Sequence, residues 1–135
     1  MIVLDTSVLS AVFRRRRPPA QEPEAAGVLR KIISEDWPMA VPGIVLQELL
    51  SGVRGPDQFR SLKSHLEGFP ILLATRQDHE GAAHIANTCR AAGVSTATVD
   101  CLIAAQTIAV QGEIFTLDRD FEAIAAHAKL RLFRA

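Results

Sequence analysis

The chain has 135 residues, a length that suits one domain with its own hydrophobic core, and we expect a single domain over residues 1–135. Apolar residues make up 48% of the chain and charged residues 22%, which is a globular composition, and no apolar stretch is long enough for a membrane helix. Fifteen basic residues balance fifteen acidic ones, which excludes a bulk positive field for non-specific nucleic-acid binding.

The N-terminal half begins with a strand and continues mainly as helices. Residues 2–4 form a short apolar run typical of a buried strand, and Asp5 ends the run before it has the length of a secretory leader, so we expect a cytoplasmic protein. Apolar residues at helical spacing then predict a helix over residues 8–13, which Thr6 or Ser7 would cap. The same spacing predicts helices at 24–36, 42–52 and 56–68, with a brief strand at 39–41.

The C-terminal half alternates strands and helices. The predicted elements are a buried strand at 70–74, helices at 75–93 and 96–112, a strand at 113–118, a helix at 119–128 and a candidate last strand at 130–133. Strands that alternate with helices favour a parallel sheet. We therefore expect a three-layer α/β domain, with a central, mostly parallel sheet of four to five strands flanked by helices.

A run of four arginines is the one local concentration of positive charge. It consists of Arg14, Arg15, Arg16 and Arg17, directly after the first predicted helix. The run has two interpretations, a contact surface for nucleic acid or a solvated loop. The two cysteines and four histidines show no spacing of a zinc site, and we expect them to be ordinary buried or surface residues.

Two acids stand at the ends of predicted strands. Asp5 follows the strand at 2–4, and Asp118 closes the strand at 113–118. Sites in parallel α/β folds collect at the carboxyl ends of the strands, beside the point where the strand order reverses, so both acids should project from the same rim. Each acid also has a purely structural interpretation, because aspartate is a good N-cap for a following helix.

Two further acids interrupt apolar helical stretches. Glu48 lies in IVLQELL, and Asp100 lies in TVDCLIAA. A carboxylate among apolar side chains carries a desolvation cost unless it has a hydrogen bond, a basic partner or a cation, and the sequence offers no obvious basic partner nearby. The structural alternatives are that Glu48 points outward from its helix and that the helix dipole favours Asp100 in a first turn.

The four acids taken together point to a metal. Carboxylates brought together without bases would repel one another and raise their own pKa values, whereas a divalent cation removes the conflict. Oxygen ligands suit Mg²⁺ or Mn²⁺, and such a centre activates water and neutralises charge on a phosphodiester without a nucleophilic Ser, Cys or His. The chain also has no G-x-S-x-G motif and no glycine-rich phosphate loop.

Four sequence motifs resemble the PIN-domain family, in particular the VapC-type ribonuclease toxins of type II toxin-antitoxin systems. They are IVLDTSVLSAVF around the first acid, VPGIVLQELLSGV around the second, VDCLIAAQTIAVQG around the third and IFTLDRDFEAIA around the fourth. The resemblance runs from residue 2 to about residue 125. Any one motif is weak, but four acids in family order at family-like spacing are a specific signal.

The resemblance implies a PIN-like fold and an endoribonuclease that depends on Mg²⁺ or Mn²⁺. Carried over to this chain, it makes Asp5, Glu48, Asp100 and Asp118 the catalytic acids, with Asp5 and Asp100 as the most direct metal ligands. Glu48 and Asp118 would complete the site directly or through water, and Glu48 is a candidate general base. Asp120 is an alternative to Asp118.

The resemblance also implies partners. They are an RNA substrate, a second copy in a homodimer, and a cognate antitoxin whose C-terminal segment lies across the active site, often reaching it with a basic side chain. Thr6 and Thr116 would steady the neighbouring carboxylates by hydrogen bonds. The run from Arg14 to Arg17 lies outside the family pattern, and its use in gripping RNA is a hypothesis.

Two alternatives compete with the ribonuclease interpretation. One is a PIN fold that has lost catalysis and acts as a binding module; loss of an acid would be its signature, and all four acids are present. The other is a haloacid-dehalogenase-like phosphatase, which also has an aspartate after its first strand. Such phosphatases require a second aspartate two residues later, where this chain has Ser7.

Overall fold

The computed structural model describes residues 1–14 and 23–134, without the side chain of Arg14. In these residues five short strands form one parallel sheet, in the order β3-β2-β1-β4-β5. The strands are β1 (Ile2–Leu4), β2 (Met39–Pro42), β3 (Ile71–Leu72), β4 (Glu113–Phe115) and β5 (Arg131–Leu132). The helical segments are α1 (Thr6–Leu9), the π-helical turn η1 (Ser10–Arg14), α2 (Glu24–Ser34), α3 (Gly43–Ser51), α4 (Pro56–Leu66), α5 (Arg76–Ala91), α6 (Thr98–Ala109) and α7 (Asp120–Ala125).

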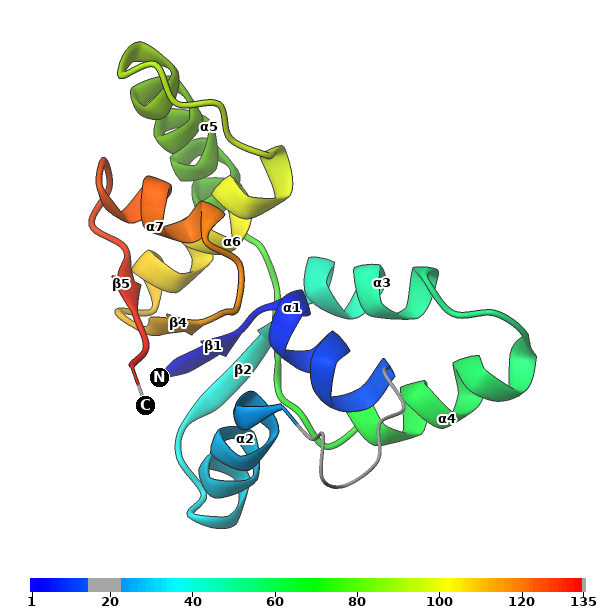
Figure 1. The fold of residues 1–135 in the computed structure, drawn as a ribbon. Coiled ribbons are helices and arrows are strands. Elements are labelled where there is room, and N and C mark those ends of the chain that lie inside the picture. The colour runs from blue at the N-terminus through cyan, green and yellow to red at the C-terminus, as the bar shows by residue number, and fades with distance from the viewer. Residues whose placement is uncertain (15–22, 135) are drawn as a thin grey trace.

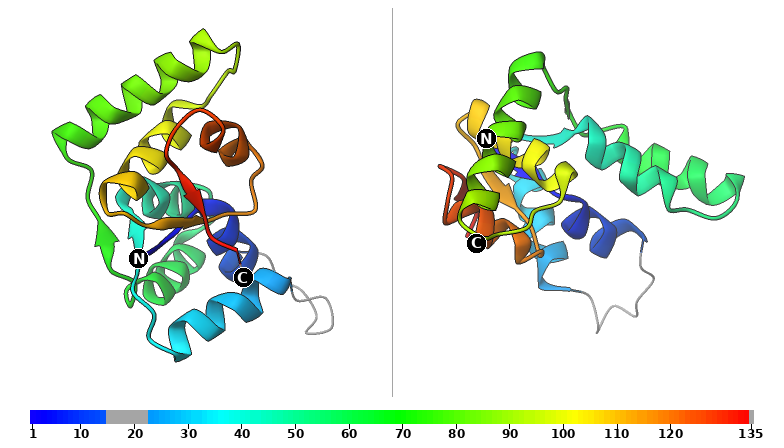
Figure 2. Two further views of the ribbon diagram at one scale, coloured as in Figure 1. Left: turned by 90° about the vertical axis from the view of Figure 1, so that its left-hand side faces the viewer. Right: turned by 90° about the horizontal axis from the view of Figure 1, so that it is seen from above.

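Helices cover both faces of the sheet, which confirms the expected three-layer α/β domain. Helices α5, α6 and α7 gather on one side of the strands, and α1 to α4 lie on the other (Figure 1). Helices α3 and α4 form a hairpin that projects away from the sheet (Figure 2). In the described part of the chain, no helix has the length and apolar character needed to cross a membrane.

The strand order creates one reversal beside the central strand. From β1 the chain moves outward to β2 and β3, and it then returns through α5 and α6 to place β4 on the other side of β1. Strands β1 and β4 pair in parallel, with Ile2 opposite Glu113 and Leu4 opposite Phe115. The carboxyl ends of these two strands therefore form the switch point, where α/β folds place their ligand sites.

The core between sheet and helices fixes this switch point. Val3, Leu4 and Ile114 of the two central strands are fully buried. At the amino end of β4 the chain passes so close to the N-terminus that a Cβ atom at Gly112 would lie 2.8 Å from the main-chain oxygen of Met1. Glycine at this position therefore allows β4 to pair with β1 in the observed register.

Two local features differ from the sequence predictions. The strand expected at 70–74 is reduced to Ile71–Leu72 on the sheet edge, and Leu73 is 73% exposed, so the prediction of a buried strand was wrong. Among the described residues β3 pairs only with β2, so it is an edge strand. The apolar residues of an edge strand do not by themselves show that the strand is buried. The first helix begins at Thr6, two residues earlier than predicted, and the side chain that caps it is Asp5 rather than Thr6 or Ser7.

Candidate metal centre

The Asp5 carboxylate stands at the carboxyl end of β1 and is held firmly by its neighbours. It is 4% exposed, and its Oδ2 accepts hydrogen bonds from Thr116 Oγ1 at 2.7 Å and from Ser7 Oγ at 2.8 Å. The Ser7 amide adds a longer contact of 3.4 Å to the same oxygen, which is the N-cap bond of α1. No donor in residues 1–14 and 23–134 reaches Oδ1 of Asp5, so this oxygen remains available to a ligand.

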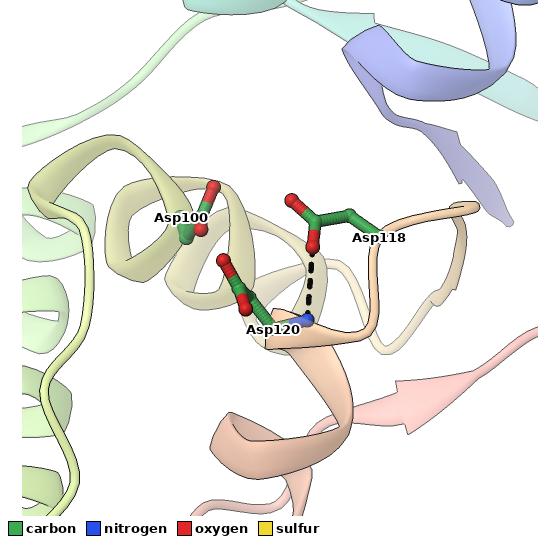
Figure 3. Close-up of side chains that lie close together, drawn as sticks. All are labelled: Asp100, Asp118 and Asp120. Carbon is green, nitrogen blue, oxygen red and sulfur yellow. Dashed lines mark hydrogen bonds between the residues drawn. The ribbon is translucent and has the colours of Figure 1, made fainter.

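Thr116 connects Asp5 to the loop that follows β4. Its hydroxyl donates to Asp5 and accepts a hydrogen bond of 3.0 Å from the Asp118 amide. Asp118 in turn accepts a hydrogen bond of 2.9 Å at Oδ1 from the Asp120 amide, directly before α7 (Figure 3). This chain of bonds positions both loop aspartates relative to the end of β1.

Asp100 lies in the first turn of α6 and faces these two loop aspartates (Figure 3). One carboxylate oxygen from each of Asp100, Asp118 and Asp120 lies within 4.8 Å of the others. In the described part of the chain this is the one group of three or more Asp, Glu, His or Cys side chains that approach so closely. We call these three residues the aspartate triad.

Burial and neighbouring acids both disfavour the negative charge of Asp100. Its pKa is raised from 3.8 to about 6, first by burial and then by the negative charges of Asp118, Asp5, Asp120 and Glu48, in that order of importance. Among the described residues, every charged group that perturbs the pKa of Asp100 is thus an acid. The same contributions show that all the acids predicted from the sequence lie near Asp100.

Glu48 joins this group from α3, on the other side of the sheet from α6. The Thr6 hydroxyl, in the first turn of α1, donates a hydrogen bond of 2.9 Å to Glu48 Oε1. Glu48 is exposed, as its structural interpretation expected, but the bond to Thr6 directs its carboxylate toward the carboxyl end of β1. Glu48 and Asp5 both lie outside the aspartate triad.

Ser7, which the sequence marks only as a candidate cap, has a larger part in the structure. The Ser7 hydroxyl donates to Asp5, contacts Thr116 Oγ1 at 3.2 Å and accepts a hydrogen bond of 2.9 Å from the Leu117 amide. The signal in the sequence is a hydroxyl two residues after an aspartate that ends a strand.

The predicted RNA-binding run falls mostly outside the structural description. Arg15, Arg16 and Arg17 lie outside the described residues, as does the side chain of Arg14.

The donor set fits a hard divalent cation. The available ligand atoms are carboxylate oxygens, and two oxygens bound to one Mg²⁺ at about 2.1 Å lie at most about 4.2 Å apart, close to the spacing within the aspartate triad. A cation would also relieve the repulsion that raises the pKa of Asp100. The site is therefore an acidic centre at the switch point of a parallel α/β domain, suited to Mg²⁺ or Mn²⁺.

Comparison with known proteins identifies the family to which this parallel α/β domain belongs. The family model described as PIN domain matches residues 2–127, and the chain belongs to the PIN-domain family. It is 32% identical over 134 residues to the VapC ribonuclease Mb1587 of Mycobacterium bovis, covering 97% of this chain and 96% of the relative. Ribonuclease VapC11 of Mycobacterium tuberculosis matches with the same identity and coverage.

Solved structures share the fold at lower sequence identity. FitAcB from Neisseria gonorrhoeae superposes with a TM-score of 0.77 at 24% identity, covering 99% of this chain and 97% of that chain. VapBC2 from Rickettsia felis, bound to a DNA fragment from its promoter, gives a TM-score of 0.77 at 19% identity and covers 98% of each chain. At these identities the likeness establishes the PIN-like α/β fold.

Proposed function

We propose that this protein is a divalent-metal-dependent endoribonuclease that acts in the cytoplasm as the toxin of a VapC-type toxin-antitoxin pair. The observation that carries the proposal is the gathering of acids around Asp100, because every charged group among the described residues that shifts its pKa is an acid. The names of the curated relatives, VapC ribonucleases matched over nearly their whole length, support RNA as the substrate. The sequence resemblance led to the same conclusion from the four acidic motifs.

The residues divide into metal ligands and groups that prepare water. We assign the ligands to Asp100, to Asp118 or Asp120, and to the unengaged Oδ1 of Asp5. Mg²⁺ or Mn²⁺ bound there would activate water and neutralise charge on the phosphodiester. Glu48, held by Thr6, orients the attacking water and accepts its proton, while the water oxygen bonds to phosphorus and the bond to the leaving ribose oxygen breaks.

The direct test measures cleavage by the purified protein, freed of any antitoxin, on a pool of cellular RNA. Reactions with and without Mg²⁺ or Mn²⁺ are run for the wild type, Asp5→Asn, Asp100→Asn and a matched control, Asp57→Asn. Asp57 lies on α4, and its side chain is 92% exposed, so its replacement leaves the acidic centre intact. New RNA ends are identified by sequencing.

We expect cuts that require metal, persist in Asp57→Asn and vanish in both site variants. The same cuts from Asp5→Asn and Asp100→Asn would identify a contaminant and contradict the proposal. If no RNA is cut and metal leaves the melting temperature unchanged, the chain is a binding module, because a ligand that binds only the folded state must raise the melting temperature.

An antitoxin is the first partner that we propose. The solved structures similar in fold include toxin-antitoxin complexes, among them one from Klebsiella pneumoniae with a TM-score of 0.69. The acids that surround Asp100 offer a binding point for a basic side chain on such a partner, which would exclude the metal. Co-expression with the gene product encoded beside this one, followed by co-purification, tests this assignment.

A second copy of the chain is the second partner. Among the described residues β3 pairs only with β2, and the apolar side chains of Ile71 and Leu73 at this edge are 40% and 73% exposed. Exposed apolar groups on a sheet edge are typical of a contact surface. Light scattering of the wild type and of Leu73→Glu tests the homodimer, which we expect the charged variant to weaken.

A further inference from the structure

A cavity of about 200 Å³ adjoins the aspartate triad on the side of β5. It is formed by the loop after β4, by α7 and by the segment after β5, and its lining includes Thr116, Leu117, Asp118, Arg119, Phe133 and Arg134. Asp118 belongs to both the cavity and the triad, so a group bound in the cavity lies directly beside the acidic centre.

The cavity brings two arginines, Arg119 and Arg134, to the edge of the acidic centre, together with the acids Asp118 and Glu122. Arg119 lies between the two loop aspartates in the sequence, and its guanidinium makes no hydrogen bond or ion pair with the described residues. Arg134 Nη2 lies 3.9 Å from Glu122 Oε1, and these side chains are 74% and 56% exposed. Such a loose, exposed pair contributes little stability, so Arg134 can exchange Glu122 for another anion at little cost.

The cavity also offers apolar contact surface. Leu117 is 53% exposed although it lies next to the buried end of β4. The Phe133 ring is half-buried and fixed by two aromatic contacts, at 5.2 Å from the Phe115 ring and 6.3 Å from the Trp37 ring. A fixed aromatic ring and an exposed leucine form a surface against which a planar base can pack.

Building on the nuclease function proposed above, we propose that this cavity binds the RNA nucleotide next to the scissile phosphodiester. The base packs against Leu117 and Phe133, and the neighbouring phosphate lies between Arg119 and Arg134. A polyanionic substrate needs such cations, because the acids around Asp100 repel it. The volume of about 200 Å³ lies below the roughly 300 Å³ of pockets for drug-sized ligands, so the cavity takes the base alone and the phosphate stays at its rim.

The first test measures binding of a fluorescent single-stranded RNA by anisotropy in Mg²⁺ at several salt concentrations. Asp100→Asn is the background, so that the bound RNA stays intact, and Arg119→Gln and Arg134→Gln are compared with Lys129→Gln. Lys129 carries the same charge but lines a different cavity with Ala109, at the end of α6 opposite Asp100. We expect each arginine variant to weaken binding about tenfold and to reduce the slope of log K against log salt by about 0.7, whereas Lys129→Gln changes neither.

A second test measures how the contact between Leu117 and the RNA base affects cleavage by the active protein. Leu117 is exposed, so Leu117→Ala should leave folding unchanged. We expect a higher KM with a smaller change in kcat, and a broader choice of nucleotide beside the cut when the new RNA ends are sequenced. An unchanged metal-induced shift in melting temperature in Arg119→Gln verifies that the triad beside this arginine is intact.

The outcomes separate the two proposals. Arginine variants that bind RNA with the same affinity and salt slope as Lys129→Gln, together with an unchanged cut profile in Leu117→Ala, overturn the nucleotide site even if the wild type cuts RNA normally. Arginine variants that bind RNA normally and lose only antitoxin also overturn it, because the cavity then holds protein. If the wild type cuts nothing, the nuclease function fails, and a reduced salt slope in the arginine variants still supports an RNA site.

Discussion

Asp5 and Asp100 are assigned the same role by the sequence, yet the two positions differ in every physical respect. Asp5 is 4% exposed, but three donor contacts satisfy one of its oxygens and it caps α1. Asp100 accepts no hydrogen bond from the described residues, and burial and four neighbouring acids raise its pKa to about 6. One carboxylate is therefore built into the fold, and the other is destabilising until a cation arrives.

Because of this difference, Asp5 and Asp100 should affect the stability of the fold in opposite ways although both are proposed metal ligands. A carboxylate that accepts several hydrogen bonds stabilises the folded state whether or not the metal is present. A carboxylate held among like charges lowers stability and gains affinity for a cation in return. Replacing each acid should therefore produce similar losses of activity and opposite changes in stability.

The largest expected effect is on cleavage. We expect Asp5→Asn and Asp100→Asn each to lower kcat/KM by more than about 1,000-fold, since each removes a proposed ligand.

The same two variants should change stability in opposite directions. In EDTA, we expect Asp100→Asn to raise the melting temperature. We expect Asp5→Asn to lower it, with a loss of about 1 kcal/mol in the free energy of unfolding. Calorimetry of both variants measures the signs; two destabilised variants would contradict the contrast drawn between the two acids.

The strand ends were predictable from simple rules, because a parallel sheet directs its carboxyl ends to one rim. That rule predicts, from the positions of the strands alone, that Asp5 and Asp118 lie close together. Glu48 and Asp100 were conspicuous because each interrupts an apolar helix. The confirmed three-layer fold followed from the alternation of strands and helices in the same way.

Other features depend on contacts that no local pattern encodes. Strand β4 stops at Phe115, three residues before the predicted end, and the loop then folds back so that the Asp120 amide reaches Asp118. That fold-back places Asp120 beside Asp100, whereas the sequence offered it only as an alternative to Asp118. The hydrogen bond from the Leu117 amide to the Ser7 hydroxyl likewise joins segments 110 residues apart.

Asp118 and Asp120 provide the next contrast, because both lie in the aspartate triad and only one was expected to act. The Asp118 amide donates to Thr116, and the Asp118 carboxylate accepts a hydrogen bond from the Asp120 amide at the start of α7. The Asp120 side chain, in contrast, is exposed and accepts no hydrogen bond from the described residues. We expect Asp118→Asn to lower kcat/KM about 100-fold and Asp120→Asn about tenfold. Titration of Mg²⁺ into both variants measures the cost in affinity, and equal effects would assign both as ligands.

A smaller effect is expected at the two threonines. Thr116 donates to the buried Asp5 and accepts a hydrogen bond from the Asp118 amide, so Thr116→Val removes one donor from Asp5 and leaves the Asp118 amide without this partner. Thr6 donates only to the exposed Glu48. We expect about a tenfold loss of kcat/KM for Thr116→Val and less for Thr6→Val, with rescue in Thr116→Ser. A larger loss of kcat/KM in Thr6→Val than in Thr116→Val would show that positioning Glu48 matters more for catalysis than positioning Asp5.

The smallest expected effect is the pH dependence of stability without metal. The pKa of Asp100 is about 6 in the folded protein and 3.8 in the reference state, so the folded state binds this proton more tightly. The free energy of unfolding should therefore fall by about 1 kcal/mol, after allowance for solvent screening, as pH rises from about 4 to about 6. Above about pH 6 it should stay level. Because other carboxylates also titrate, the quantity to measure is the difference between wild type and Asp100→Asn in EDTA. The difference in unfolding free energy should widen as pH rises across this range. It should close when Mg²⁺ is added, because the cation replaces the proton on Asp100. A difference that does not depend on pH would show that Asp100 is as well solvated as an ordinary surface acid.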